Sequence, residues 1–437
     1  VTYAFTRRQI LSEAFKGIRL VLPAGGYKVR ANDTDYNYRP HSAYVYYSGV
    51  QGADATAEAV LVLEPSGDSH ITYLYMNPRS TRDTDAFYRD AKYGELWVGR
   101  RFTLDEAKAR YQIDTRHLSE LEALLADGKE TLTLRSVDAL VDQKVKTHAR
   151  EEEFATFVSE QRLCKDVYEI DELQAAVDAS ALGFNDVIAA IPAAVETPRG
   201  ERVLDAAFYG RARILGNDLG YNTIVGSGAH ACVLHWIRND GDVRPGDLVL
   251  IDAGVEVESF YTADITRTLP VSGKFTAAQR SLYMLVYEAQ LAGFAAIKPG
   301  VKFSDINRTC QEVLARGLAD LGVLTVSAEE SMKPEVGLHR RWTLHGVSHH
   351  LGLDVHDCAQ ARKENYLDGE LREGMVLTVE PGLYIQPDDE LFAPEYRGIG
   401  IRIEDDVVVT ADGCRNLSES IPRHPDEIEK WMKSILR

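Results

Sequence analysis

Four carboxylates and one histidine lie in order in the second half of the chain, each within a short apolar or glycine-flanked segment. They are Asp252, Asp264, His349, Glu380 and Glu404. An ionised carboxylate buried among apolar side chains is costly unless it is paired, protonated or bound to a metal. The four positive charges of two divalent cations would balance the four carboxylates, and a neutral imidazole adds a ligand without adding charge. The residue types therefore predict a site for two divalent metal ions.

Three segments with strand-like alternation and β-branched residues carry four of these five residues. The segments are residues 247–270, 374–385 and 398–410. A helix is expected after the first of them, because Thr276 and Gln279 have the spacing of a capping box. A Lys-Pro-Gly run at 298–300 would end that helix. The pattern therefore predicts helices outside a sheet that carries the ligands.

Short motifs surround the ligands. They read L-I-D-A-G from Leu250, D-I-T-R-T from Asp264, H-G-V-S-H-H-L-G from His345, T-V-E-P-G from Thr378 and I-R-I-E-D-D from Ile401. Together with Y-N-T-I-V-G-S-G from Tyr221, they resemble the pita-bread metallopeptidases aminopeptidase P and prolidase. In the N-terminal half, R-P-H-S-A-Y-V-Y-Y-S-G from Arg39 and E-L-W-V-G-R-R from Glu95 resemble the corresponding domain of aminopeptidase P. The motifs in this order are a specific signal for the family, whereas a single one of them can occur by chance.

The resemblance implies a role for each ligand. Asp252 would chelate one metal, Asp264 and Glu404 would bridge both, and His349 with Glu380 would complete the second. Glu380 would also take the proton from the attacking water as general base. Asp252 and Asp264 are twelve positions apart (264 − 252), one more than is usual in the family. We expect the extra residue to lengthen the turn near 256–260 and to leave both carboxylates pointing inward.

Five further side chains would contact the substrate or the residues around it. By resemblance, His235 and His356 match catalytic positions that hold the substrate and stabilise the developing oxyanion. His345 matches a position in the pocket for the residue after the scissile bond, and Tyr384 lies near the same pocket. Arg402 precedes the last ligand by two residues, so it faces the same side of a strand and would orient carboxylates. Taken singly, each histidine could instead be a hydrogen-bonded core residue, and Tyr384 a packed aromatic.

Several neighbouring side chains are predicted to have structural roles. His350 is expected only to form a wall of the pocket. Asp405 and Asp406 are expected to be solvated or paired instead of binding metal. Core packing is predicted for three tryptophans: Trp97, Trp236 and Trp342.

The composition narrows the class of protein. With 437 residues and 45% hydrophobic content, the chain can bury a large core in two or three domains. Its formal net charge of −18 disfavours binding to nucleic acid or to anionic membranes. No apolar run reaches the roughly 18 residues of a membrane span, and the first residues lack a signal core. Five scattered cysteines form no C-x-x-C pair, which predicts a reducing, cytoplasmic location.

The chain is expected to have two domains of class α/β (α+β). Residues before about 150 alternate helices with short apolar strands, which predicts an α/β unit. A charged run at 148–153 marks a change in composition. We therefore expect an N-terminal α/β domain like that of aminopeptidase P at residues 1–160 and a C-terminal pita-bread catalytic domain at residues 161–437.

The resemblance implies a dinuclear metal aminopeptidase that releases the first residue from peptides with proline in second position. Proline lacks an N–H and restricts the chain, so peptidases that need a hydrogen-bonded, extended substrate fail on such peptides. The family generally prefers Mn²⁺, and the oxygen-rich ligand set agrees, although Co²⁺ or Zn²⁺ would also bind. Relatives are commonly homo-oligomers, so a dimer or tetramer is expected.

Other members of the fold remain as alternatives. Prolidase shares every ligand but cleaves only dipeptides. Methionine aminopeptidase lacks the long N-terminal domain. A non-catalytic pita-bread binding module or the metal-free enzyme creatinase would have lost ligands that this chain keeps.

Overall fold

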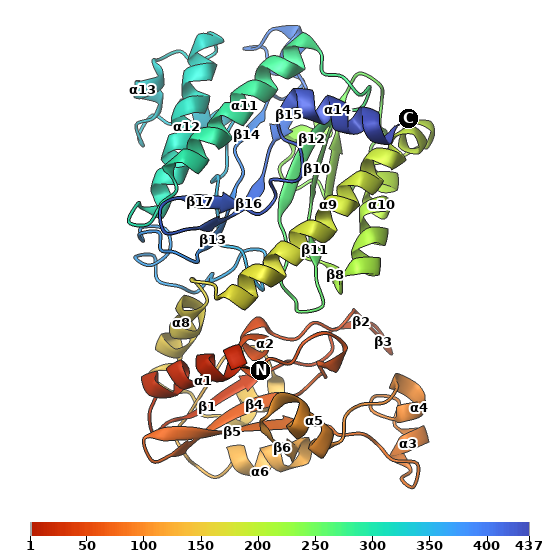
Figure 1. Ribbon diagram of the computed structural model, residues 1–437, viewed down its shortest axis with the longest axis vertical. Helices are drawn as coiled ribbons and strands as arrows, with labels where there is room; N and C mark the ends of the chain where they lie inside the picture. The colour runs from red at the N-terminus through yellow and green to blue at the C-terminus, as the bar shows by residue number, and fades with distance from the viewer. Residues whose placement is uncertain (1, 437) are drawn as a thin grey trace. The chain divides into compact units, whose positions relative to one another are not determined.

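The computed structural model describes residues 2–436, and the chain divides into two compact units, Val1–Gln161 and Arg162–Arg437 (Figure 1). The first unit is built on a five-stranded sheet in the order β6 (Asp114–His117), β5 (Ser69–Met76), β4 (Val60–Ser66), β1 (Arg19–Pro23) and β7 (Thr131–Thr133). β7 and β6 pair in parallel with β1 and β5, and the other pairs are antiparallel. The α/β character expected for this half of the chain is confirmed.

Short helices pack around this sheet. They are α1 (Thr2–Ala14), α2 (Ser42–Ser48), α3 (Ala86–Arg89), α4 (Glu95–Val98), α5 (Leu104–Tyr111), α6 (Leu121–Leu125), α7 (Ala139–Lys144) and α8 (Glu151–Gln161), with the 3₁₀ turns η1 (Gly52–Asp54) and η2 (Leu118–Glu120). A small hairpin joins β2 (Val29–Ala31) to β3 (Thr34–Asp35).

The prediction of core packing is wrong for Trp97, which is 60% exposed. Its helix, α4, has four residues and lies between Gly94 and Gly99, so it is too short to bury an apolar face against a neighbour. The indole N–H instead donates to the carbonyl of Tyr88, 2.7 Å away. Trp342, by contrast, is buried as predicted.

The second unit places several small antiparallel sheets side by side. They are the three-stranded sheets β12 (Ile265–Pro270), β10 (Leu248–Ala253), β9 (Ile224–Ser227) and β13 (Val376–Val379), β16 (Asp405–Val409), β17 (Cys414–Asn416), and the pairs β14 (Gly382–Tyr384), β15 (Gly400–Arg402) and β11 (Val255–Glu256), β8 (Asp218–Leu219). Strands β9, β10, β12, β13, β15 and β16 are buried along their whole length. The expected strand segments are confirmed.

Long helices cover these sheets (Figure 1). They are α9 (Val167–Glu196), α10 (Gly200–Leu215), α11 (Ala277–Ala296), α12 (Phe303–Asp320) and α14 (Pro425–Ile435), with the shorter α13 (Ala328–Ser331) and the 3₁₀ turns η3 (Gly228–Cys232), η4 (Leu338–Arg341) and η5 (Pro394–Tyr396). α10 packs on β9 and α11 on β13 and β15. The predicted arrangement of helices outside a strand core is therefore confirmed.

Helix α11 begins where the sequence predicts. Thr276 is its N-cap and accepts a hydrogen bond from the backbone of Gln279, whose side chain accepts from the backbone of Thr276, forming a capping box. Within residues 2–436, no helix combines the length and apolar character needed to cross a membrane.

Candidate active site and metal centre

A cavity of about 530 Å³ lies in the second unit. Every site residue predicted from the sequence lines it except Tyr384, namely Asp252, Asp264, His349, Glu380, Glu404, His235, His345, His356 and Arg402. Its remaining lining is largely apolar and includes Ile224, Leu234, Ile237 and Val355. The cavity therefore combines a polar floor of titratable groups with apolar walls.

Hairpin geometry brings Asp252 and Asp264 together. Asp252 is the penultimate residue of the buried strand β10, opposite Thr266 of β12, and Asp264 directly precedes β12. The chain reverses between them through a tight turn in which Phe260 has a φ of +70°. Both carboxylates are within hydrogen-bond distance of the Tyr221 hydroxyl, at 2.7 Å and 2.5 Å. The longer spacing thus leaves the two acids on the same side.

The Tyr221 hydroxyl lies between two carboxylates. A hydroxyl has one proton, so Tyr221 can donate to only one carboxylate at a time. The other contact is satisfied when Asp264 carries a proton, and burial raises the pKa of Asp264. A cation bound between the carboxylates would take the place of that proton.

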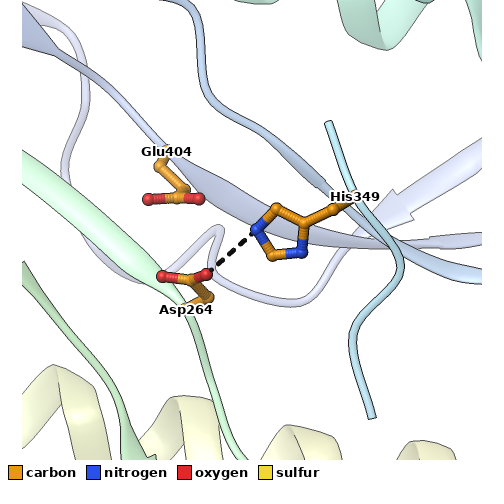
Figure 2. Close-up of side chains that lie close together, drawn as sticks. All are labelled: Asp264, His349 and Glu404. Atoms are coloured by element: carbon orange, nitrogen blue, oxygen red, sulfur yellow. Dashed lines mark ion pairs between the residues drawn. The ribbon is translucent and has the colours of Figure 1, made fainter. Parts of the chain in front are cut away.

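Asp264, His349 and Glu404 form the tightest cluster of possible ligands (Figure 2). One ligand atom from each lies within 4.8 Å of the others. Nε2 of His349 is 3.2 Å from Asp264 and 3.6 Å from Glu380, so a third predicted carboxylate borders the cluster. Glu404 follows β15, and its carboxylate accepts a hydrogen bond of 2.6 Å from the Thr266 hydroxyl.

The orientation of His349 suits a metal ligand. Its Nδ1 is 3.1 Å from the carbonyl oxygen of His350 and must donate a proton there, which leaves Nε2 facing the carboxylates. Burial lowers the pKa of His349, but the hydrogen bond and the charges of Asp264 and Glu380 outweigh it and raise the pKa to about 9. In the metal-free protein Nε2 therefore holds a proton at the place where a cation would bind.

The charge balance of the cavity also fits divalent cations. Burial, together with repulsion from the other carboxylates, raises the pKa of Glu404 and of Glu380. Arg402 is the nearby permanent cation, and it pairs with Asp252 at 2.6 Å. Arg402 and a protonated His349 would still leave an excess of negative charge if all four carboxylates were ionised, and divalent cations would offset that excess, so the residues present fit a divalent metal site.

His345, Tyr384 and Arg402 form one hydrogen-bonded chain. Arg402 donates to the Tyr384 hydroxyl at 2.9 Å, and that hydroxyl donates to Nε2 of His345 at 2.8 Å. Nδ1 of His345 donates to the carbonyl of Gly346 at 2.9 Å. Burial, with Arg402 nearby, lowers the pKa of His345 to about 4, so this histidine is neutral. Tyr384 thus lies behind the cavity wall and fixes the side chains in front of it.

The two histidines predicted to act in catalysis reach the cavity from different loops. The His356 ring lies edge-on to His349, with ring centroids 4.5 Å apart. Burial, with His349 close by, lowers the pKa of His356. His235 is exposed on the segment between η3 and β10 and lines the cavity from that side.

One interpretation of a neighbouring residue needs correction. His350 does not line the cavity: it is buried, stacked on Phe303 with ring centroids 5.4 Å apart and lying edge-on to Tyr366. The backbone explains this, because its bridge with Leu377 turns successive side chains to opposite faces. Asp405 and Asp406, which were expected to be solvated or paired, are both fully buried, and the pairing alternative is confirmed for Asp405. Asp405 pairs with Arg267 at 2.8 Å.

Sequence reasoning did not identify Tyr221 or Thr266 as site residues. Tyr221 opens the Y-N-T-I-V-G-S-G motif, and Thr266 lies inside D-I-T-R-T, so both were within segments that carried the resemblance. Their contacts join segments distant in sequence: Thr266 and Glu404 are 138 residues apart. The sequence signal for these two residues was their position inside motifs that resemble the family's, but the motifs do not show which carboxylates the two hydroxyls contact.

Comparisons with known proteins decide the family. Residues 171–411 match metallopeptidase family M24, and residues 3–134 match the aminopeptidase P N-terminal domain. Xaa-Pro aminopeptidase 1 of Streptomyces coelicolor is 50% identical over 98% of this chain and 86% of its own length. The chain belongs to the aminopeptidase P branch of family M24.

Solved aminopeptidase P structures share the whole fold. The Escherichia coli enzyme with the inhibitor Pro-Leu superposes with a TM-score of 0.86 at 34% identity, covering 99% of this chain and 98% of that one. Proline aminopeptidase P II from Yersinia pestis gives 0.85 at 32% identity, with 99% of each chain covered. The chain is therefore a pita-bread metallo-aminopeptidase that depends on divalent metal and releases the residue preceding proline at the N-terminus of peptides.

Proposed function

We propose that this aminopeptidase P holds two divalent cations, Mn²⁺ in the native enzyme, on Asp252, Asp264, His349, Glu380 and Glu404. The observation that carries the proposal is the convergence of Asp264, His349 and Glu404 within 4.8 Å, with the other two carboxylates on the same cavity. When bound, such cations act as Lewis acids that polarise a carbonyl and acidify water. The oxygen-rich set favours Mn²⁺ over softer metals, and the zinc-substituted enzyme of E. coli illustrates that Zn²⁺ can replace it in a relative.

The side chains around the ligands would divide the remaining work. Glu380 would accept a proton from the attacking water, because its carboxylate lies on the cavity beside His349. His356 and His235 would hold the substrate carbonyl as its oxygen gains charge. Asp252, bonded to Arg402, lies where a free N-terminal amine would find a counter-charge.

His345 and its partners would form the pocket for proline. The neutral His345 ring is fixed by Tyr384, which Arg402 holds in turn. A fixed, uncharged ring offers an apolar face to a pyrrolidine ring and needs no N–H from the substrate. The apolar wall residues Leu234 and Val355 add to the same surface.

The preferred substrates in this proposal are X-Pro-Y tripeptides and longer peptides, cleaved by a cytoplasmic homo-oligomer, a dimer or tetramer. The N-terminal residues 1–160 and the catalytic residues 161–437 would act as separate domains, and the first would control which chain lengths reach the cavity. The E. coli relative was solved with Pro-Leu, which has the form of the product of an X-Pro-Leu tripeptide.

Hydrolysis of an X-Pro dipeptide against an X-Pro-Y tripeptide, with Mn²⁺ present, tests this preference. We expect kcat/KM for the tripeptide to equal or exceed that for the dipeptide. Strict dipeptide cleavage would make prolidase the better assignment. Light scattering on the same sample tests the assembly, and a monomer would refute that part.

A further inference from the structure

Glu201 is a buried carboxylate with no part in the reaction described above. It lies in the first turn of α10, and its side chain is 0% exposed. Oε1 accepts hydrogen bonds from the backbone of Ser227 at 2.8 Å and from Nδ1 of His230 at 2.9 Å. Oε2 accepts from Nε1 of Trp236 at 2.8 Å and from the backbone of Gly241 at 2.6 Å. One carboxylate therefore satisfies four donors, all from residues 227–241.

This segment, residues 227–241, carries His235 to the rim of the cavity. Two anchors inside this segment hold it to the protein: the Cys232 thiol donates to the carbonyl of Ile385 at 3.1 Å, and the Asn239 side-chain amide donates to the carbonyl of Thr223 at 2.9 Å. Between these anchors Val233 is 44% exposed and Ile237 51%. His235 is exposed like these two residues, while its neighbours Leu234 and Trp236 are half-buried and pack against the core, so these neighbours determine where the histidine lies.

Trp236 connects this exposed stretch to Glu201. Besides its hydrogen bond, the indole stacks on the His230 ring with centroids 3.9 Å apart and an angle of 26° between planes. His230 is bound to the same carboxylate, so the ring beneath Trp236 is itself fixed. A rotation of the Trp236 ring would break both contacts, so they hold the residue next to His235 in one position.

The backbone around Glu201 is built for this contact. A Cβ placed on Gly241 would lie 2.4 Å from Nδ1 of His230 and 2.7 Å from Oε1 of Glu201. A side chain there would push the carboxylate away from its donors. Hydrogen bonds accepted by an ionised carboxylate such as Glu201 are about twice as strong as neutral ones, so they can anchor a surface segment.

We propose that Glu201, acting through the Trp236 indole, positions His235 for catalysis. Glu201 and Trp236 are positioning residues, and the inference rests on the proposed role of His235 in holding the substrate carbonyl. In enzyme active sites, a misplacement of a catalytic group by about 1 Å can lower turnover roughly 100-fold, and the same tolerance would apply to His235. The carboxylate keeps the imidazole within that tolerance although its segment is exposed.

The experiment is a double-mutant cycle of Trp236→Phe and His235→Ala in the full-length, Mn²⁺-loaded enzyme. Phenylalanine keeps a ring to stack on His230 and removes the N–H. Trp431→Phe is the matched control, because it removes an indole hydrogen bond of 2.7 Å to Asn185 from α14, a helix that contributes no residue to the cavity. The readouts are kcat and KM on an X-Pro-Y tripeptide, bound metal, and the urea midpoint of unfolding.

Trp236→Phe is expected to lower kcat by roughly 10-fold or more with bound metal unchanged, and to lower the unfolding midpoint by the same amount whether or not His235 is present. In the His235→Ala background the same change should alter kcat by less than about 2-fold, since there is no imidazole left to misplace. Glu201→Gln should reproduce the loss, because an amide has one acceptor oxygen for four donors.

Three outcomes would overturn the inference. An equal loss of kcat in both backgrounds would mean a general structural role. Full activity of Trp236→Phe beside an impaired His235→Ala would refute the inference and leave the role of His235 intact. Normal kcat in His235→Ala would refute that role and the inference with it.

Discussion

Replacing Tyr221 with phenylalanine should weaken metal binding without removing a metal ligand. The change deletes one hydroxyl, which lies 2.7 Å from Asp252 and 2.5 Å from Asp264, and keeps the ring. Removal of a hydrogen-bond partner from a ligating side chain typically lowers metal affinity by roughly 10- to 100-fold. That factor corresponds to about 1.4–2.7 kcal/mol of binding free energy. We expect this loss because both carboxylates are then free to turn away from the cluster.

Titration of metal-free protein with Mn²⁺, followed by calorimetry and by recovered activity, measures the effect. Tyr261→Phe is the matched control, since its buried hydroxyl donates to Glu169 at 2.9 Å and neither residue lines the cavity. At saturating Mn²⁺ the Tyr221→Phe enzyme should recover most of its kcat, which separates ligand positioning from chemistry. Unchanged affinity in Tyr221→Phe, or an equal loss in Tyr261→Phe, would refute the reasoning.

Two further predictions follow from the same contacts. The His356→Ala variant should keep both metals and have a lower kcat, because the His356 ring lies edge-on to His349 and is not one of the proposed ligands. Loss of metal from the folded variant would contradict this prediction. Asp357→Asn should reduce the decrease of the unfolding free energy at acid pH. Burial raises the pKa of Asp357, but the charges of Arg162 and Lys165 outweigh burial and lower that pKa. That stabilisation is complete above the unfolded pKa of about 3.9 and is lost as pH falls through the folded value, so urea unfolding below about pH 4 should show the difference. The control is Asp354→Asn, since the half-buried Asp354 contacts the same arginine, Arg162, at 2.8 Å.

Local patterns in the sequence were enough to place the proposed ligands on or beside buried strands and to predict the helix that follows the first two. The acids are flanked by β-branched residues, which placed them on or beside buried strands, and Thr276 with Gln279 defined the start of α11. These features depend on neighbours in the chain, and local patterns record them directly.

Contacts between distant segments could not be predicted. Arg402 and Asp252 are 150 residues apart, and only the packing of β15 against β10 brings the guanidinium to the carboxylate. Glu201 likewise gains its role from donors that lie 26 to 40 residues away. The residues that were misplaced, Trp97 and His350, have apolar or aromatic side chains whose burial depends on helix length and strand facing, which composition does not encode.

Metal stoichiometry tests the central proposal most directly. Protein dialysed against Mn²⁺ and then freed of excess metal should contain two ions per chain by elemental analysis, whereas Glu404→Ala, which lacks one proposed bridging carboxylate, should contain fewer and show no turnover of an X-Pro-Y tripeptide. A folded wild-type chain that retains one ion or only traces, or a Glu404→Ala variant with near-normal turnover, would contradict the dinuclear site.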